Sequence, residues 1–121
     1  DGRQPEELER TNAFAYSAGN VNNFFLLGVI GEYLDIDVFG YVGPEGQSIR
    51  KALEFLLPYA MEEKEWTYQQ IAGMERVNAR MYELLKKAAH HYDDRSYADM
   101  ADRMATQHGE LNAEVVNLLY P

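Results

Sequence analysis

The sequence contains no cysteine, no long uninterrupted apolar run and few positive charges. Without cysteine, disulfides, thiolate nucleophiles and thiolate metal sites are excluded, and both reducing and oxidising compartments fit equally well. No run is long enough for a transmembrane helix, and no signal peptide is recognisable. Lys and Arg number 11 against 20 Asp and Glu, a formal net charge of −9. This acidity disfavours nucleic acid and membrane surfaces as partners.

What remains is one domain's worth of chain with a substantial apolar content. The 121 residues are 46% hydrophobic, enough for a moderate core, and we predict a single all-α domain over residues 1–121. The chain starts at Asp1 without a Met, inside what reads as a connecting segment. We therefore expect a processed or truncated piece of a longer protein.

Helical periodicity dominates the sequence, and no segment alternates between apolar and polar residues for long. A short strand is allowed only near residues 36–39. This pattern predicts an all-α protein whose helices are joined by short loops, as in antiparallel helical hairpins. After a short turn that starts at Pro5, the predicted helices span 12–34, 48–58, 67–92, 96–108 and 110–119. The second begins at the N-cap Ser48 and ends or kinks at Pro58.

The helix predicted over 12–34 has two different halves. Its second half, Phe24–Ile30, is apolar almost all round, which is typical of a buried helix. Its first half carries a polar stripe on one side. Farther along the helix, the same side becomes apolar, with Leu27, Ile30 and Leu34. The stripe consists of Asn12, Tyr16, Gly19, Asn20 and Asn23. Because unpaired buried amides are costly, this stripe predicts a groove.

Two further predictions concern the C-terminal half of the chain. Thr67 and Gln70 have the spacing of a capping box, which predicts that the third long helix opens there. Its predicted core stripe is Ile71, Met74, Met81, Leu85, Ala88 and Tyr92. The last helix is predicted to bury Leu111, Val115, Leu118 and Leu119.

Other chemistry-bearing residues have ordinary explanations. His90 and His91 are adjacent, diverge by about 100° on a helix, and belong to no Glu-x-x-His or His-x-x-x-His pattern, so we predict no metal site and no cofactor. Trp66 could stack on a sugar ring, although a lone loop Trp more often seals the edge of a core. For Arg10 and Tyr16, the residues alone favour a buried Tyr16 bonded to Asn20 and a surface ion pair of Arg10.

Several runs resemble the C-terminal part of the alginate lyase family, helical polysaccharide lyases with an incomplete (α/α) toroid. The runs are DGRQPEELERTNAFAYS, GVIGEYLDIDVFGY, GPEGQSIRKALEFLLPYA, EWTYQQI and the closing NLLYP. The resemblance implies cleavage of a uronate-containing polysaccharide by β-elimination. Tyr16 would be base and acid, and Arg10 would neutralise the carboxylate. Gln4, Asn20 and Asn23 would contact sugar or tune Tyr16, and Trp66 is a further candidate for a sugar contact.

The same resemblance implies partners and a location. The substrate would be an anionic polysaccharide, alginate or another polyuronate, and the protein would be periplasmic or secreted. The missing N-terminal helices of the parent chain, or a homo-oligomer, would complete the groove. Family members of the better-known type carry an Asn-His pair that is absent here, so either the rest of the site lies in a missing N-terminal part or this branch differs. A piece that holds only one wall of the groove is expected to bind substrate poorly.

Geometry sets one condition on this assignment. Positions six apart on one helix differ by about 120° in direction and by about 9 Å along the axis. Arg10 and Tyr16 can therefore meet only if Arg10 lies before the regular helix. An alternative is a non-catalytic helical interaction or carbohydrate-binding module that packs through Phe24–Ile30.

Overall fold

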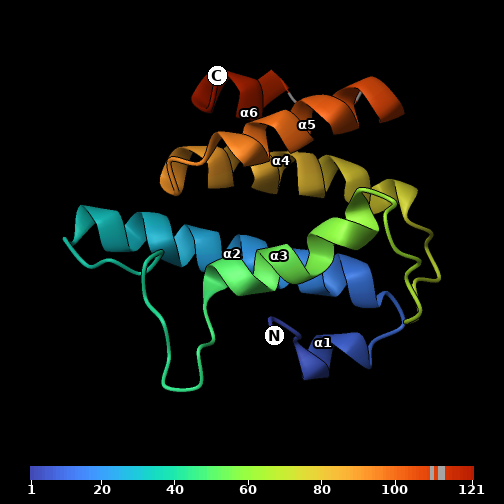
Figure 1. Ribbon diagram of the computed structural model, residues 1–121, viewed down its shortest axis with the longest axis horizontal. Coiled ribbons are helices and arrows are strands. Elements are labelled where there is room, and N and C mark those ends of the chain that lie inside the picture. The colour runs from blue at the N-terminus through green and yellow to red at the C-terminus, as the bar shows by residue number, and fades with distance from the viewer. Residues whose placement is uncertain (110, 112–113) are drawn as a thin grey trace. The chain divides into compact units, whose positions relative to one another are not determined.

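The computed structural model describes residues 1–109, 111 and 114–121 (Figure 1). These residues contain six helices and no strand, so the predicted all-α class is confirmed, and residues 36–39 belong to an irregular loop instead of a strand. The helices are α1 (Pro5–Leu8), α2 (Ala13–Tyr33), α3 (Ile49–Ala60), α4 (Glu75–His91), α5 (Arg95–His108) and α6 (Glu114–Leu119). They belong to two compact units, Asp1–Ala72 and Gly73–Pro121.

In the first unit, α2 packs against α1 and α3. Its core includes the fully buried side chains Phe14, Phe25, Leu53 and Leu56. α3 forms as predicted, because the Oγ of Ser48 accepts a hydrogen bond from the backbone N–H of Lys51 and satisfies one donor of the first turn. Pro58 lies inside the last turn, and the helix continues to Ala60 instead of ending there.

The second half of α2 is not buried all round, and that prediction is wrong. Phe25 is 1% exposed, whereas Leu26, Leu27 and Ile30 are 53–54% exposed. The reason is that α1 and α3, the helices packed on α2 in this unit, leave this side uncovered. α2 therefore presents a large apolar surface beyond its polar stripe.

The loop after α2 folds back on the helix instead of leaving it. The ring of Phe39 lies edge-on to Phe25, with 5.3 Å between ring centroids. It covers Gly28, whose missing side chain makes room for it. The side chain of Val38 packs against Gly31 in the same way. The two buried glycines of α2 therefore allow the loop to pack closely against the helix.

In the second unit, α4 and α5 pack side by side and are joined by a tight turn. Asp93 has a φ of 49° in that turn, and the carboxylate of Asp94 accepts a hydrogen bond from the N–H of Ser96 at 3.0 Å, which caps α5. α5 ends at His108, where the predicted helix 96–108 ends, and Gly109 follows it with a φ of 71°. The buried side chains of these two helices include Met81, Leu84, Leu85, Ala88, Tyr97, Ala101 and Met104.

Two predictions for the C-terminal half are corrected. α4 begins at Glu75, and residues 67–73 are not helical, so Thr67 and Gln70 do not form a capping box for it; Ile71 is 74% exposed. In α6, Val116 is buried and Val115, Leu118 and Leu119 are exposed. α6 meets α4 through its other side, where the hydroxyl of Tyr82 donates to Asn117 at 2.8 Å. The predicted start at residue 110, and residues 112–113, lie outside the described residues.

None of the helices in the described part of the chain is long and apolar enough to cross a membrane.

Candidate active site

Arg10 and Tyr16 are brought together at the N-terminal end of α2. Arg10 lies in the turn between α1 and α2, where its N–H donates to the carbonyl of Glu7 at 3.1 Å. Tyr16 lies in the first turn of α2. The Cζ of Arg10 is 3.7 Å from the centroid of the Tyr16 ring. The geometric condition is therefore met, because Arg10 precedes the regular helix.

The contact is a cation–π stack on the ring face, and the hydroxyl group projects from the ring edge. Tyr16 is 42% exposed and the Arg10 side chain 50%, so both are open to solvent. A buried Tyr16, which the residues alone favour, is therefore wrong. The expected surface ion pair of Arg10 is present, with Glu7 at 3.7 Å.

Asn20 does not bond to Tyr16 but to Gln4. The side-chain amide of Asn20 donates to the Oε1 of Gln4 at 2.8 Å. The amide of Gln4 in turn donates to the backbone carbonyl of Ser17 at 3.2 Å. Two of the predicted substrate contacts, Gln4 before α1 and Asn20 on α2, are thus brought together, and their hydrogen bonds fasten the N-terminal segment to α2.

The outward side of α2 continues from this pair as the predicted stripe. Gly19 has no heavy atom within 4 Å of the position that a Cβ would occupy, and Asn23 is exposed. Leu27, Ile30 and Leu34 follow with exposed fractions of 53%, 54% and 64%. A polar and then apolar surface therefore runs along the helix from Tyr16.

Trp66 packs among other aromatic rings. Its ring centroid lies 4.9 Å from that of Phe14, 5.0 Å from Tyr68 and 5.1 Å from Tyr59. Phe55 is the fourth neighbour, at 6.4 Å. The indole is only partly exposed, so sealing this aromatic cluster is its evident structural role.

Sequence reasoning missed the role of Gln70. Its Oε1 accepts a hydrogen bond from the backbone N–H of Ala15, in the first turn of α2, at 3.2 Å. Asn12 and Gln70 also form an isolated antiparallel bridge. No local signal could have revealed this, because the two partners are 55 residues apart in sequence.

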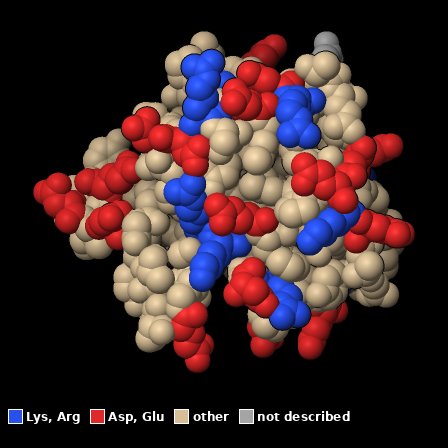
Figure 2. All heavy atoms as spheres, viewed as in Figure 1, with Lys and Arg blue, Asp and Glu red and all other residues tan. Residues whose placement is uncertain are grey.

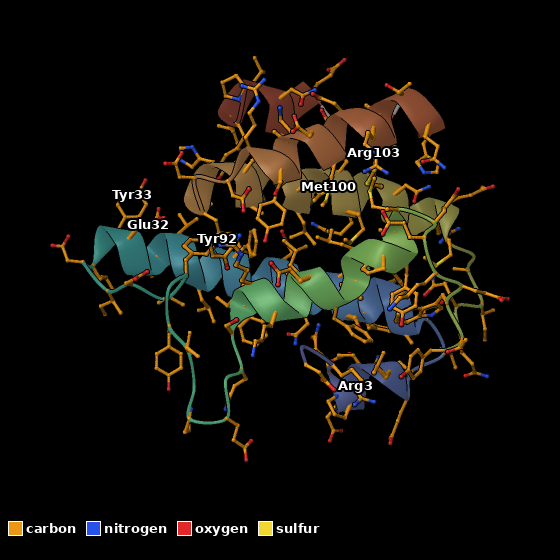
Figure 3. All side chains as sticks on the ribbon, in the orientation of Figure 1. Arg3, Glu32, Tyr33, Tyr92, Met100 and Arg103 are labelled. Atoms are coloured by element: carbon orange, nitrogen blue, oxygen red, sulfur yellow. The ribbon has the colours of Figure 1, made fainter. Side chains whose placement is uncertain are left out.

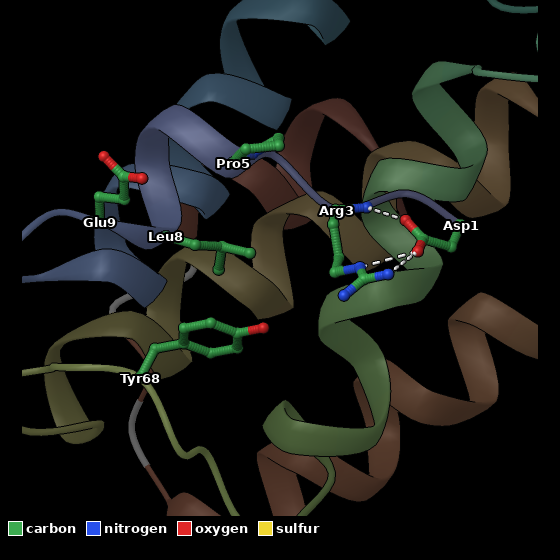
Figure 4. Close-up of a pocket in the computed structure, with 6 residues that line it drawn as sticks. All are labelled: Asp1, Arg3, Pro5, Leu8, Glu9 and Tyr68. Carbon is green, nitrogen blue, oxygen red and sulfur yellow. Dashed lines mark hydrogen bonds and ion pairs between the residues drawn. The ribbon is translucent and has the colours of Figure 1, made fainter.

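A shallow hollow of about 550 Å³ lies beside α1 (Figure 4). Two carboxylates and one guanidinium line it, and that guanidinium, Arg3, is bound to Asp1 with 2.7 Å between Nε and Oδ2. The hollow therefore offers little net attraction for an anion. Its lining residues are Asp1, Arg3, Pro5, Leu8, Glu9 and Tyr68.

Charge and metal chemistry place limits on the site. Acidic side chains are spread over the face drawn in Figure 2, so an anionic ligand requires local positive charge such as Arg10. Among the described residues, no group of three or more His, Asp or Glu side chains is placed to hold a metal ion. His90 and His91 contact each other and Tyr120.

Comparison with known proteins adds two findings. The profile of a family described as alginate lyase matches residues 1–66, more than half of the chain. The crystal structure of an alginate lyase from Bacteroides ovatus matches with a TM-score of 0.81 and 30% sequence identity. That match covers 86% of this chain but only 28% of the other. A search of curated proteins finds no match.

Proposed function

The chain belongs to the alginate lyase family, and we propose that it supplies part of the active site of a polysaccharide lyase. The reaction would be β-elimination on a uronate-containing polysaccharide, with alginate as the first candidate substrate. The observation that carries the proposal is the stack of Arg10 on Tyr16, open to solvent at the start of α2.

The chemistry has three requirements. A base removes the proton at C5 of the uronate, an acid protonates O4 as the C4–O4 bond breaks, and positive charge stabilises the carboxylate as it becomes enolate-like. A double bond then joins C4 and C5. In our proposal, the phenolate form of Tyr16 takes the C5 proton and becomes a phenol, which then delivers that proton to O4 as the C4–O4 bond breaks, and Arg10 binds the carboxylate.

The exposure of Arg10 suits this role. Its ion pair with Glu7 is long, at 3.7 Å, and the Arg10 side chain is half exposed. Exposed pairs of this kind contribute little to stability, so a substrate carboxylate can replace Glu7 at low cost. The planar guanidinium can form two parallel hydrogen bonds to a carboxylate while it keeps its contact with the ring.

The sugar contacts of the proposal lie around this pair. Asn20 lies one turn after Tyr16 on α2 and is bonded to Gln4 of the N-terminal segment, and Asn23 is exposed farther along the helix. Gly19 has no side chain in this stripe, and no heavy atom lies within 4 Å of the position that its Cβ would occupy. Trp66 would contribute only the part of its indole that the neighbouring rings leave uncovered.

We further propose that residues 1–121 form the C-terminal part of a larger lyase, built from antiparallel helical hairpins of an incomplete (α/α) toroid. In support, the match with the lyase structure covers only 28% of that chain, and further helices can pack on the exposed apolar side of α2. The periplasm or the cell exterior, where polyuronates occur, is the proposed location.

The test replaces Tyr16 by Phe in the full-length lyase that contains this chain. The ring that carries Arg10 is kept and only the hydroxyl is lost. We expect at least about a hundredfold loss of kcat on alginate, the scale of removing a general acid–base group. The assay follows the ultraviolet absorbance of the unsaturated uronyl ends.

Tyr33→Phe is the matched control. Tyr33 lies at the opposite end of α2, is 86% exposed, and points away from the helix in Figure 3. This variant should keep full activity. If Tyr16→Phe also keeps it, Tyr16 is not the base, and the exposed Phe24–Ile30 surface then favours the alternative of a non-catalytic interaction module.

A further inference from the structure

The segment 69–72 is hydrogen-bonded to the turn that carries Arg10. The N–H of Ala13 donates to the carbonyl of Gln69 at 2.9 Å, and the N–H of Ile71 donates to the carbonyl of Thr11 at 3.1 Å. These two bonds make the antiparallel bridge between Asn12 and Gln70. A short loop therefore holds the backbone on both sides of Asn12.

The side chains of the bridged pair add two more hydrogen bonds. Asn12 is the N-cap residue of α2, but its side chain caps no N–H of its own helix. Its Oδ1 instead accepts from the N–H of Ala72 at 2.9 Å. The Oε1 of Gln70 accepts from the N–H of Ala15, a first-turn donor that an N-cap side chain commonly satisfies. The first turn of α2 is thus capped from a distant part of the chain.

We propose that Gln70 is a positioning residue for the reaction, because it fixes the first turn of α2 and so the placement of Tyr16 against Arg10. This inference rests on the proposed function. Tyr16 follows Ala15 directly, and Arg10 precedes the bridged Asn12. The cation–π contact spans the same turn that the four hydrogen bonds hold.

The proposal explains why an exposed loop is tied so closely to α2. Arg10 has a long, flexible side chain, and among the residues that the structure describes its ion pair is a weak one with Glu7. Its position over the ring depends on the backbone of the turn. Small displacements of reacting groups, even about 1 Å, can lower a rate by roughly a hundredfold.

The experiment compares three variants of the full-length lyase on alginate. Gln70→Met keeps the length of the side chain but has no acceptor for the Ala15 N–H. Gln70→Glu keeps an acceptor oxygen, and a carboxylate is favourable at a helix N-terminus. Gln69→Ala is the matched control, because only the backbone carbonyl of Gln69 takes part in the bridge.

For Gln70→Met we expect kcat to fall by roughly ten- to hundredfold, with little change in KM. Amide hydrogen exchange should become faster in the first turn of α2, as measured by mass spectrometry on the peptide around Ala15. Gln70→Glu should recover most of the kcat, and Gln69→Ala should behave as the wild type in both measurements.

The proposal is overturned if Gln70→Met retains wild-type kcat, or if Gln70→Glu is impaired as strongly as Gln70→Met. It is also overturned if the lost kcat only follows the fraction of unfolded enzyme at the assay temperature. Tyr16→Phe reports on the function separately. An inactive Tyr16→Phe beside a fully active Gln70→Met refutes the positioning role alone, whereas an active Tyr16→Phe refutes the proposed function.

Discussion

Gly19 and Gly28 lie on the same helix, α2, in opposite environments. A Cβ on Gly28 would lie 2.5 Å from ring atoms of Phe39, which is itself 6% exposed and packed against Phe25. A Cβ on Gly19 would meet nothing within 4 Å. Gly28 therefore makes room for a core side chain, Phe39, whereas Gly19 lies on open surface one turn after Tyr16.

These environments predict opposite effects of alanine. Gly28→Ala should destabilise the chain by about 1–3 kcal/mol, because the Phe39 ring must move within a packed core. Gly19→Ala should leave stability unchanged or raise it by up to about 1 kcal/mol through helix propensity. Denaturant unfolding followed by the fluorescence of Trp66, the single tryptophan, measures both. Equal effects of the two substitutions would contradict this account.

At the residue scale, the Arg10–Tyr16 pair also matters for its geometry. A guanidinium stacks flat on an aromatic face, whereas an ammonium acts as a point charge. The 3.7 Å stack thus uses a property that Lys lacks.

At the scale of elements, α2 and α3 begin in different ways. The cap of α3 is local: Ser48 accepts from Lys51 at 3.1 Å, three residues on. The cap of α2 comes from Gln70, 55 residues away. A local cap can be recognised from neighbouring residues, whereas a distant one depends on the folded chain.

The local cap predicts a measurable loss. Ser48→Ala should lower the free energy of unfolding by about 1 kcal/mol, because a first-turn N–H of α3 loses its acceptor. Ser48→Asp is the control, since a carboxylate accepts the same bond and should preserve stability. Denaturant unfolding followed by the fluorescence of Trp66 measures the free energy of unfolding of both variants. An unaffected Ser48→Ala variant would show that the bond to Lys51 contributes nothing.

At the scale of the whole molecule, two properties oppose each other. The net charge of −9 keeps copies of the chain apart. The exposed apolar side of α2 favours association, because contiguous apolar surface of this kind commonly marks an interface. At physiological ionic strength the charge repulsion is screened beyond about 8 Å, so the apolar surface should prevail.

We therefore expect the isolated chain to self-associate, as seen by sedimentation. A Leu27→Glu, Ile30→Glu double variant should weaken association by at least about tenfold, since each buried Leu or Ile contributes roughly 1.5–3 kcal/mol. Ile71→Glu is the control, because Ile71 is 74% exposed but lies outside α2. A strictly monomeric wild type would instead fit a stand-alone module.

Much of the fold could be predicted because its signals are local. The bounds of α2, the start of α3 at the Ser48 cap, the turn at Asp93 and the stop at Gly109 all follow from residues close in sequence. The side of α2 that carries Tyr16 was also predictable, because helical periodicity places residues on faces without reference to any partner.

The predictions that failed concern which surface a neighbour covers. Periodicity identifies an apolar face, but it does not reveal whether another element packs there; Ile30 in α2 and Leu118 in α6 are exposed for this reason. The prediction for Gln70 failed for a different reason. Its spacing from Thr67 fits a local cap, but the hydrogen bond to Ala15 is made instead.

The sequence by itself determined the helical class, most helix ends and the outward stripe of α2, because backbone propensity, capping and periodicity act over a few residues. Only the tertiary structure decided that Arg10 stacks on the Tyr16 ring, that Asn20 bonds to Gln4, and that a loop from residues 69–72 caps α2. Contacts between residues far apart in sequence depend on how the helices and loops pack, and no local pattern encodes that packing.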